Sequence, residues 1–368
     1  MYGYAGGYTI TKFFNSFKKI SFLLDRFETL MLNSDLNKLN IESPIYITGL
    51  ARAGTTIILE MLHKHPDLAS HQYKHFLIPY LPHWIGQIFK KNMRFTKSFE
   101  RLHKDGIIVT YESPEALEEI FWQKFFNGIH NENNSNIISG SISNPKFEKF
   151  YRNHIRKLIF SQNGSRYLAK NNYNVTRLGY LLRLFPNSKF LLIIRNPVDH
   201  IASLIKQTRL FIKLEQENPF LNDWLRIIGH HEFGHNQVCI NVGNTDLIRK
   251  IRKLWRNKKT IVKGWAHYWI SIYDFVANLF DANKILKKAT LVVRYDELCE
   301  TPAKIIDQII EHTELPAEKF EKVKEYYVKH LHKPTYYSPD FSNRDLAYIS
   351  EVTKTTITRF GLKLPDYT

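Results

Sequence analysis

The segment from Gly49 to Thr56, which reads GLARAGTT, constrains the fold of this chain more than any other. A short apolar run, residues 44–48, precedes it, and residues 57–62 follow with the apolar spacing of a helix. A strand, a glycine-bounded loop and a helix in this order form an anion cradle, because the loop N–H groups and the helix N-terminus point at one spot. The segment therefore predicts an α/β fold with a site for an anionic group.

The cradle lacks the residue that a nucleoside triphosphatase requires. Its glycines have the G-x-x-x-x-G spacing of a P-loop, but Thr55 stands where a P-loop has lysine after the second glycine, Gly54. P-loop kinases and ATPases use that lysine at the β- and γ-phosphates. The cation of this loop is Arg52 instead. The pattern keeps the anion site and argues against triphosphate chemistry.

Strands and helices alternate along the chain. Residues 189–194 and 290–293 are near-continuous apolar runs, which are typical of strands buried on both faces. Helical patterns that begin with proline follow them, at Pro197–Gln207 and Pro302–Thr313. This order predicts a parallel sheet with right-handed crossovers. We therefore expect an α/β fold of the P-loop-type, three-layer kind, with a central parallel sheet flanked by helices.

We expect residues 41–368 to form a single domain behind an N-terminal helical extension, residues 1–40. Residues 10–31 carry apolar side chains at helical spacing. This helix is expected to pack on the body of the protein, and the alternative is contact with a membrane surface or a second copy of the chain. Residues 208–262 are polar, irregular and basic, so we expect a variable insertion there.

Two further helices are expected between the first and second strands. One runs from about Phe76 to Phe99 and is rich in aromatic residues and histidine. The other begins at Ser113, a favourable N-cap residue, with Pro114 at the first helical position.

Composition limits the partners and the compartment. A net charge of +17 favours an anionic ligand, nucleic acid or an anionic surface, but the lysines are scattered and predict no nucleic-acid site. Two cysteines, Cys239 and Cys299, are too few for a disulfide framework or a cysteine-based metal site, and they suit a reducing compartment. Because no stretch approaches the length of a transmembrane helix, we expect a cytoplasmic protein without a transmembrane segment.

A second anion site is predicted at the end of the strand at residues 189–194. Arg195 stands just beyond that end, which is where open α/β sheets bind ligands. Ser203 lies two turns into the following helix, so the two side chains can hold a second phosphate. The alternative is a structural pair between Arg195 and Asp199, with Ser203 as a small packing residue.

Taken together, these segments resemble the sulfotransferase superfamily, which uses 3′-phosphoadenosine 5′-phosphosulfate (PAPS). The loop at 49–56 resembles its 5′-phosphosulfate loop, and the stretch from Arg195 to Ser203 resembles its 3′-phosphate motif. A third match is Val293–Pro302, a strand followed by Tyr295, acidic residues and proline. The strand end at Lys170 also resembles the family. The ordered elements span residues 44–316 and are similar to the bacterial-type and tyrosylprotein-type branch.

The resemblance implies a donor site and a reaction. Arg195 and Ser203 would hold the 3′-phosphate, Tyr295 would pack near the adenosine, and Lys170 would also contact the donor. Sulfuryl transfer would run in line to an acceptor hydroxyl or amine and leave adenosine 3′,5′-bisphosphate. No metal is expected. The 5′-phosphosulfate would be held by the Arg52 side chain and by the N–H groups of Ala53, Gly54, Thr55 and Thr56.

Arg52 would stabilise the charge that builds on the leaving phosphate oxygen, and the acceptor hydroxyl needs a general base. In the family this is a Glu or His soon after the first βα unit, where this chain has Ser70–Phe76. We predict His75 as the base, then His71, then Glu112, although each histidine fits a core or surface position equally well.

The acceptor stays open between a small molecule, a glycan and a peptide, and the basic composition slightly favours an acidic or glycan acceptor. His231–His235 reads H-E-x-x-H, but Gly229 and Gly234 argue against the helix that a zinc protease needs. The competing functions are a P-loop phosphotransferase and a non-catalytic basic module that binds anionic glycan or nucleic acid.

Overall fold

The structure is a computed structural model that describes residues 2–91, 98–334 and 338–363. Five strands form a parallel sheet in the order β2-β5-β1-β6-β7, and two short strands form an antiparallel hairpin, β3-β4. The strands are β1 (Ile45–Thr48), β2 (Leu68–Ala69), β3 (Phe99–Glu100), β4 (Ile108–Val109), β5 (Arg166–Lys170), β6 (Lys189–Ile194) and β7 (Thr290–Arg294).

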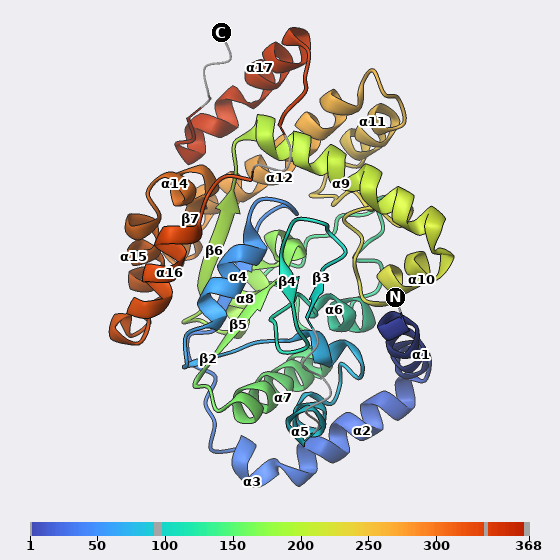
Figure 1. Ribbon diagram of the computed structural model, residues 1–368, viewed down its shortest axis with the longest axis vertical. Helices are drawn as coiled ribbons and strands as arrows, with labels where there is room; N and C mark the ends of the chain where they lie inside the picture. Colours follow the sequence, from blue (N-terminus) through green and yellow to red (C-terminus); the bar gives the residue numbers. More distant parts are fainter. Residues whose placement is uncertain (1, 92–97, 335–337, 364–368) are drawn as a thin grey trace.

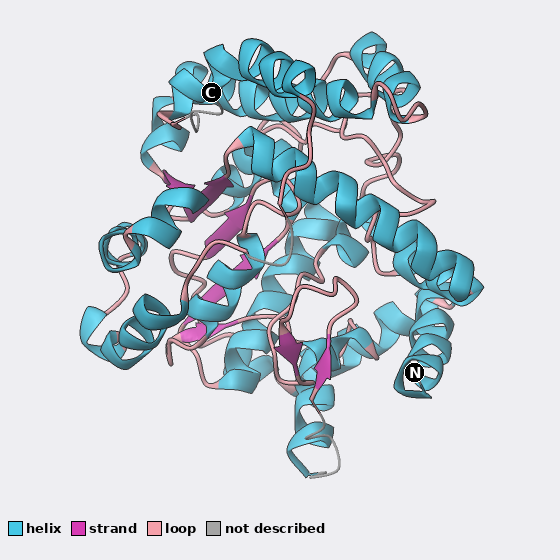
Figure 2. Cartoon of the chain, turned by 45° about the horizontal axis from the view of Figure 1, so that its top comes forward, coloured by secondary structure: helices cyan, strands magenta, loops and turns pink. Residues whose placement is uncertain are grey.

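Helices make up most of the remaining structure and surround the sheet (Figure 2). The α-helices are α1 (Tyr2–Ser16), α2 (Lys18–Met31), α3 (Asn33–Leu36), α4 (Thr55–His63), α5 (Pro82–Lys91), α6 (Glu119–Phe125), α7 (Pro145–Gln162), α8 (Leu178–Leu184), α9 (Pro197–Glu217), α10 (Pro219–Ile227), α11 (Thr245–Trp255), α12 (Ile261–Ala282), α13 (Lys284–Lys288), α14 (Tyr295–Glu300), α15 (Pro302–Thr313), α16 (Glu321–His330) and α17 (Asn343–Phe360). Within the described ranges, 3₁₀ turns also occur: η1 (Tyr73–Phe76), η3 (Asn172–Thr176) and η4 (Ala317–Lys319).

The sheet is the middle of three layers, as predicted. Successive side chains of β1 point to opposite faces: Tyr46 joins the larger core cluster, and Ile45 and Ile47 join the smaller one. The larger cluster draws on helices such as α7 and α12, and the smaller one on α4 and α15 (Figure 1). Both faces of the sheet are covered, which explains the continuous apolar runs in its strands.

The parallel strands place their carboxyl ends along one edge of the sheet. β1 pairs with both β5 and β6, and β6 pairs with β7. The residues that leave these strands are Gly49, Asn171, Arg195 and Tyr295. Chain segments far apart in sequence therefore converge on one site.

Several local predictions differ from the structure. The helix expected over 76–99 is shorter, because α5 spans Pro82–Lys91 and Phe99 lies in β3; residues 92–97 lie outside the described part of the chain. The helix expected at Ser113 begins only at Glu119. Ser113 and Glu115 instead form backbone hydrogen bonds with the segment 71–73, and Pro114 forms a β-bridge with Gln72. The hydrogen bonds to the segment 71–73 hold this stretch extended, so the favourable N-cap residue Ser113 does not start a helix here.

The region 208–262 is more regular than its sequence indicated. Helix α9 runs on to Glu217, and α10 and α11 occupy much of the region beyond it. Both have asparagine N-caps that accept a backbone N–H, Asn218 for α10 and Asn244 for α11. The expectation of an irregular insertion was therefore wrong in its secondary structure.

The N-terminal helix expected over 10–31 is split at Phe17 into α1 and α2. Phe22 of α2 packs on the core, where it contacts the rings of Tyr80, Phe125 and Phe150, but most of the other apolar side chains of the segment stay exposed. Charge also holds α2 to α5 and α7. The buried ammonium of Lys157 lies 2.7 Å from Asp25 and 2.9 Å from Glu28, and Glu28 also accepts the N–H of Trp84 at 2.8 Å. No helix within the described ranges is long and apolar enough to cross a membrane.

Replacing Lys157 with methionine tests this ionic anchor. The substitution leaves two buried carboxylates without their cation, so we expect the free energy of unfolding at neutral pH to fall by about 3–5 kcal/mol. Urea denaturation followed by circular dichroism measures the change. Lys38→Met is the matched control, because it removes an exposed pair with Asp35 and should cost under about 1 kcal/mol. Equal effects of the two substitutions would contradict the assignment.

Candidate active site

The loop between β1 and α4 has the backbone of an anion cradle. Arg52 and Gly54 adopt left-handed conformations, with φ of 71° and 105°, and Gly54 caps the N-terminus of α4. A Cβ atom on Gly54 would lie 2.2 Å from the ring of Tyr295. Only glycine fits both this φ and this approach, so the loop and the end of β7 are packed directly together.

The polar groups of the loop are tied to neighbouring elements. The N–H of Ala53 donates to the carbonyl of Leu50 at 3.1 Å, so it closes a turn of the loop itself. Thr55 Oγ1 donates to Asn172 Oδ1 at 3.4 Å. Arg52 Nε donates to Ser203 Oγ at 3.4 Å, which brings together two residues predicted to hold opposite ends of a donor.

A buried carboxylate joins two guanidinium groups at the cradle. Asp105 accepts from Arg52 Nη1 at 2.9 Å and from Arg101 Nε at 2.9 Å. Arg101 also donates to Thr56 Oγ1 at 3.2 Å. Burial by itself would raise the pKa of Asp105, but the hydrogen bonds and charges of the two arginines outweigh it and hold that pKa far below its usual range. The two arginines at the cradle therefore already bind one anionic group, the Asp105 carboxylate of the same chain.

Next to the cradle lies a cavity of about 240 Å³. Arg195 and Tyr295 line it together with Gly54 and Asp105, and the Arg195 guanidinium lies 5.2 Å from the centre of the Tyr295 ring. Asp199 lies in the first turn of α9, four residues after Arg195, and the Arg195 charge opposes the burial that raises the pKa of Asp199. Ser203 is buried beside Arg52.

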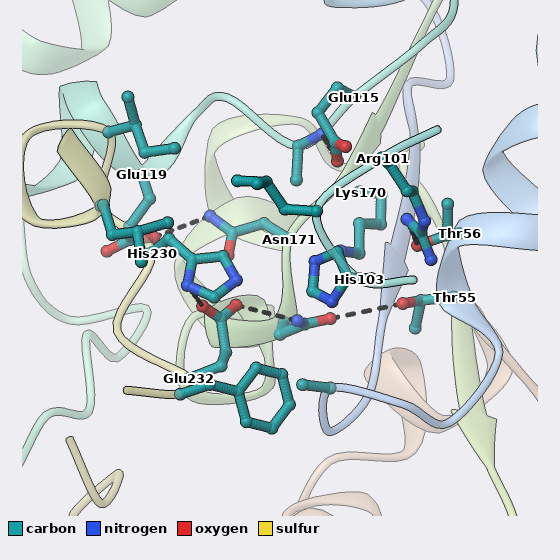
Figure 3. Close-up of a pocket in the computed structure, with 18 of the residues that line it drawn as sticks. Thr55, Thr56, Arg101, His103, Glu115, Glu119, Lys170, Asn171, His230 and Glu232 are labelled. Atoms are coloured by element: carbon teal, nitrogen blue, oxygen red, sulfur yellow. Dashed lines mark hydrogen bonds and ion pairs between the residues drawn. The ribbon is translucent and has the colours of Figure 1, made fainter. Parts of the chain in front are cut away.

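A second cavity, of about 130 Å³, opens on the other side of the cradle (Figure 3). Aromatic side chains form part of its walls, and several charged side chains also line it. The two cavities share the following lining residues: Arg52, Thr55, Thr56 and Arg101. The aromatic walls are Tyr73, Phe76, Tyr173, Phe211, Trp224 and Phe233.

The family model described as "Sulfotransferase family" matches residues 44–230, half of the chain. The chain belongs to the sulfotransferase family. The structure is similar to that of sulfotransferase STF9 from Mycobacterium avium, with 13% identity and a TM-score of 0.55 over 92% of this chain and 82% of that one. STF1 from Mycobacterium tuberculosis H37Rv is also similar, with 14% identity, the same coverages and a TM-score of 0.47. No curated protein sequence matches the chain significantly.

In this sulfotransferase the three predicted bases do not line either cavity. His71 and His75 are buried, and the His71 ring stacks on His154 at 5.0 Å. His75 Nδ1 accepts the N–H of Gln72 at 2.9 Å, so it caps the turn η1. Glu112 is exposed and pairs with Lys74. The structure thus gives these residues structural contacts.

Other titratable groups, which the sequence did not single out, do line the second cavity. His103 is partly buried between the rings of Phe211 and His230, at 5.1 and 5.6 Å. Burial and the positive charge of Arg101 lower its pKa well below the ordinary value, so the imidazole is neutral. The signal that could have identified it is its place in the charged stretch 101–105, two residues after Arg101.

Lys170, which was predicted to contact the donor, lines the second cavity. Burial lowers the pKa of its ammonium, and the charges of Glu115 and Glu232 oppose that shift. Glu232 also accepts from Asn172 Nδ2 at 2.9 Å, which links it through Asn172 to Thr55 (Figure 3). Lys170 therefore lines the cavity close to the cradle, where the negative charge of two carboxylates favours its charged form.

Glu119 also reaches this cavity, but its carboxylate is fully engaged. Arg177 binds it with two hydrogen bonds, at 2.7 and 2.8 Å, and His130 and Asn171 add one each. Burial opposes ionisation, yet these partners hold the pKa of Glu119 far below its usual range. It supports the cavity wall as a permanent anion and has no spare capacity to accept a proton.

The H-E-x-x-H string at His231–His235 lies in a loop, not a helix. Its histidines separate: His231 packs on His130 at 4.4 Å, and His235 pairs with Glu215. Among the residues that the structure describes, no group of three or more His, Cys, Asp or Glu side chains is arranged to hold a metal ion.

The buried histidines predict a loss of stability in mild acid. Burial lowers the pKa of His71 from 6.5 to about 3, so the folded protein keeps this ring neutral while the unfolded chain takes up a proton below pH 6.5. Stability from this residue is complete above pH 6.5 and is lost as the pH falls toward 3. Between pH 7.5 and 5.5 the loss is about 1.4 kcal/mol for each such group.

Urea denaturation at pH 7.5 and 5.5 measures this loss. His71→Phe keeps an aromatic ring and removes the titration, so the difference in unfolding free energy between the two pH values should shrink by about 1.4 kcal/mol. The exposed His332→Phe serves as the control and should leave the difference unchanged. If both variants behave like the unsubstituted protein, His71 does not carry the effect.

Proposed function

We propose that this sulfotransferase moves a sulfuryl group from PAPS, bound in the cavity of Arg195 and Tyr295, to a hydroxyl bound in the aromatic cavity. The observation that carries the proposal is that the two cavities meet at the cradle, where both are lined by Arg52 and Arg101. A group transferred in line needs donor and acceptor on opposite sides of one point.

The donor side provides positive charge where a phosphosulfate and a 3′-phosphate would lie. Arg52, Arg101 and the N-terminus of α4 are proposed to hold the phosphosulfate, with the N–H groups of Gly54, Thr55 and Thr56 at that terminus. Arg195 and Ser203 are proposed for the 3′-phosphate, and Tyr295 for the adenosine side. The place of Asp105 supports this assignment, because one carboxylate already accepts from Arg52 and Arg101 there.

The reaction puts negative charge on the bridging oxygen of the departing phosphate. Donors fixed in a partly closed site stabilise such charge strongly, since they need not reorganise as it forms. Arg52 is aimed at the cradle from within the loop, and Lys170 approaches it from the acceptor side. We propose that these two cations act on opposite sides of the transferred group.

We propose His103 as the general base in place of His75, His71 or Glu112. Its ring lines the acceptor cavity, and burial keeps it in the neutral form that accepts a proton. The nearby cations lower its pKa in the free protein. An anionic donor would offset those charges and raise the pKa of His103 when both substrates are bound.

The acceptor proposed from the cavity is a small apolar alcohol or phenol. Phe76, Phe211 and Trp224 offer apolar surface. The charged side chains of the lining balance, because the carboxylates Glu115, Glu119 and Glu232 offset the cations Arg52, Arg101 and Lys170, so the cavity offers an acidic glycan no excess of positive charge. This moves the expectation away from the acidic acceptor that the net charge suggested. Local charge in the cavity outweighs the charge of the whole chain, because the distant lysines are screened by salt.

Binding of adenosine 3′,5′-bisphosphate tests the donor site. Arg195→Ala should weaken binding by about 1.5–3 kcal/mol, roughly 10- to 150-fold, and Arg52→Ala should weaken it less, because the second arginine remains at the cradle. Isothermal titration calorimetry measures both. Arg209→Ala, an exposed arginine on the same helix as Ser203, is the control and should bind normally. Tighter binding of ATP than of the bisphosphate, or a requirement for Mg²⁺, would favour a phosphotransferase instead.

Loss of the base should reduce turnover without loss of the donor. His103→Gln is expected to lower kcat for sulfate transfer from labelled PAPS to a phenol panel by about 10²–10⁴-fold, with the dissociation constant of the bisphosphate within about twofold. His230→Gln makes the same change on the adjacent ring of the same cavity. If His230→Gln abolishes transfer and His103→Gln does not, His103 is not the base.

A further inference from the structure

Helices α1 and α2 expose their apolar side chains to the outside of the protein. Leu23, Leu30 and Met31 of α2 are 66%, 70% and 62% exposed. Of the fifteen large apolar side chains exposed in the described part of the chain, eight lie between residues 10 and 31. Such a concentration on one surface marks a contact site. The eight are Ile10, Phe13, Phe17, Ile20, Leu23, Phe27, Leu30 and Met31, here named the apolar stripe.

The charges of the same helices are sorted by sign. Both acidic residues, Asp25 and Glu28, point inward to the buried ammonium of Lys157. Over residues 8–31, the exposed charged side chains that the structure describes are all cationic: Lys12, Lys19 and Arg26. The Lys12 ammonium pairs with Asp223 of α10 at 3.0 Å, so Lys19 and Arg26 supply the positive charge of the outer face. The outer face is therefore apolar and basic, while its carboxylates lie beneath it.

This combination suits the surface of an anionic bilayer. An interfacial helix buries apolar side chains at the boundary between acyl chains and headgroups, and its basic residues meet anionic lipid. A second copy of the chain would bring like charges together across a two-fold interface. No helix among the described residues could span the membrane, so the fitting geometry is a helix pair lying in the plane of the interface.

We propose that the apolar stripe of α1 and α2 docks this sulfotransferase on an anionic membrane surface. The proposal goes beyond the transfer reaction and does not depend on it. It selects the membrane alternative for residues 10–31 from the arrangement of charge and exposure in the structure.

The docking face adjoins the wall of the acceptor cavity. Tyr8 of α1 contacts the rings of Phe220 and Trp224 on α10, at 5.9 and 6.5 Å, and α1 lies beside α10 in Figure 1. Thr11 donates to the carbonyl of Phe76 at 2.5 Å. Since Trp224 and Phe76 both line the acceptor cavity, docking would bring that cavity close to the lipid surface.

Co-sedimentation of the full chain with vesicles tests the proposal. We expect binding to vesicles of 70% phosphatidylcholine and 30% phosphatidylglycerol. The triple variant Leu23→Asn, Leu30→Asn, Met31→Asn should bind at least about tenfold more weakly. Ile285→Asn is the matched control, because Ile285 is 72% exposed on α13 among lysines but lies outside the stripe. It should bind as the unsubstituted protein does.

Charge gives a second readout. Lys19→Gln and Arg26→Gln should each weaken binding to the anionic vesicles by about fivefold, with little change on pure phosphatidylcholine. Because all these side chains are exposed, the midpoint of urea denaturation should stay unchanged in each variant. If the triple variant nevertheless unfolds, the single variant Leu30→Asn replaces it.

Absence of binding to anionic vesicles, or an equal loss of binding in Ile285→Asn, would overturn the proposal. So would light scattering that shows a dimer dissolved by the triple variant.

Discussion

Positive charge held at the carboxyl edge of the sheet is the constraint on which the site depends. Arg52 and Arg101 are largely withdrawn from water, so each needs an anionic partner close by. Asp105 serves both of them at once. Because Asp105 lies between β3 and β4, the hairpin is tied to the cradle by this one carboxylate. Under the proposed function, a phosphosulfate that enters the cradle would exchange with Asp105, so donor binding would be coupled to the position of the hairpin.

The second requirement is close backbone packing between the loop and the end of β7. Gly54 leaves no room for a side chain against Tyr295, and Gly49 approaches the carbonyl of Ile193 in β6 in the same way. These contacts bring the three sequence elements that resemble the family to a single edge. They also explain why the elements were recognisable in the sequence: each is a local pattern of strand, turn and helix start, and parallel pairing brings them together.

The residues of the second cavity, the proposed acceptor site, could not be predicted in the same way. His71 and His75 follow the short strand β2, where a base was expected, but the local pattern does not reveal that His71 faces His154 of α7. His103 reaches the cavity because its segment is tied to the cradle through Asp105, a contact between residues about fifty positions apart. By contrast, both ends of strand β6 were predicted correctly, because a strand that is buried on both faces has a continuous apolar run in the sequence. A cavity wall is built from residues far apart in the sequence, so no local sequence pattern marks it.

The N-terminal helices show that a helical spacing of apolar residues does not by itself identify the buried face of a helix. The spacing of apolar residues over 10–31 correctly indicated helix, and the natural inference was that the apolar side packs on the protein. In the structure only Phe22 of α2 packs well into the core, and most of the apolar side chains stay outside, because Asp25 and Glu28 face inward to the buried Lys157 and the N-terminus of α5. Two carboxylates facing one ammonium leave a local excess of negative charge. Lys157 therefore offsets only part of the free-energy cost of burying Asp25 and Glu28. The arrangement is consistent with selection for the outer surface of these helices, since a helix chosen only for packing would bury its leucines and expose its acids.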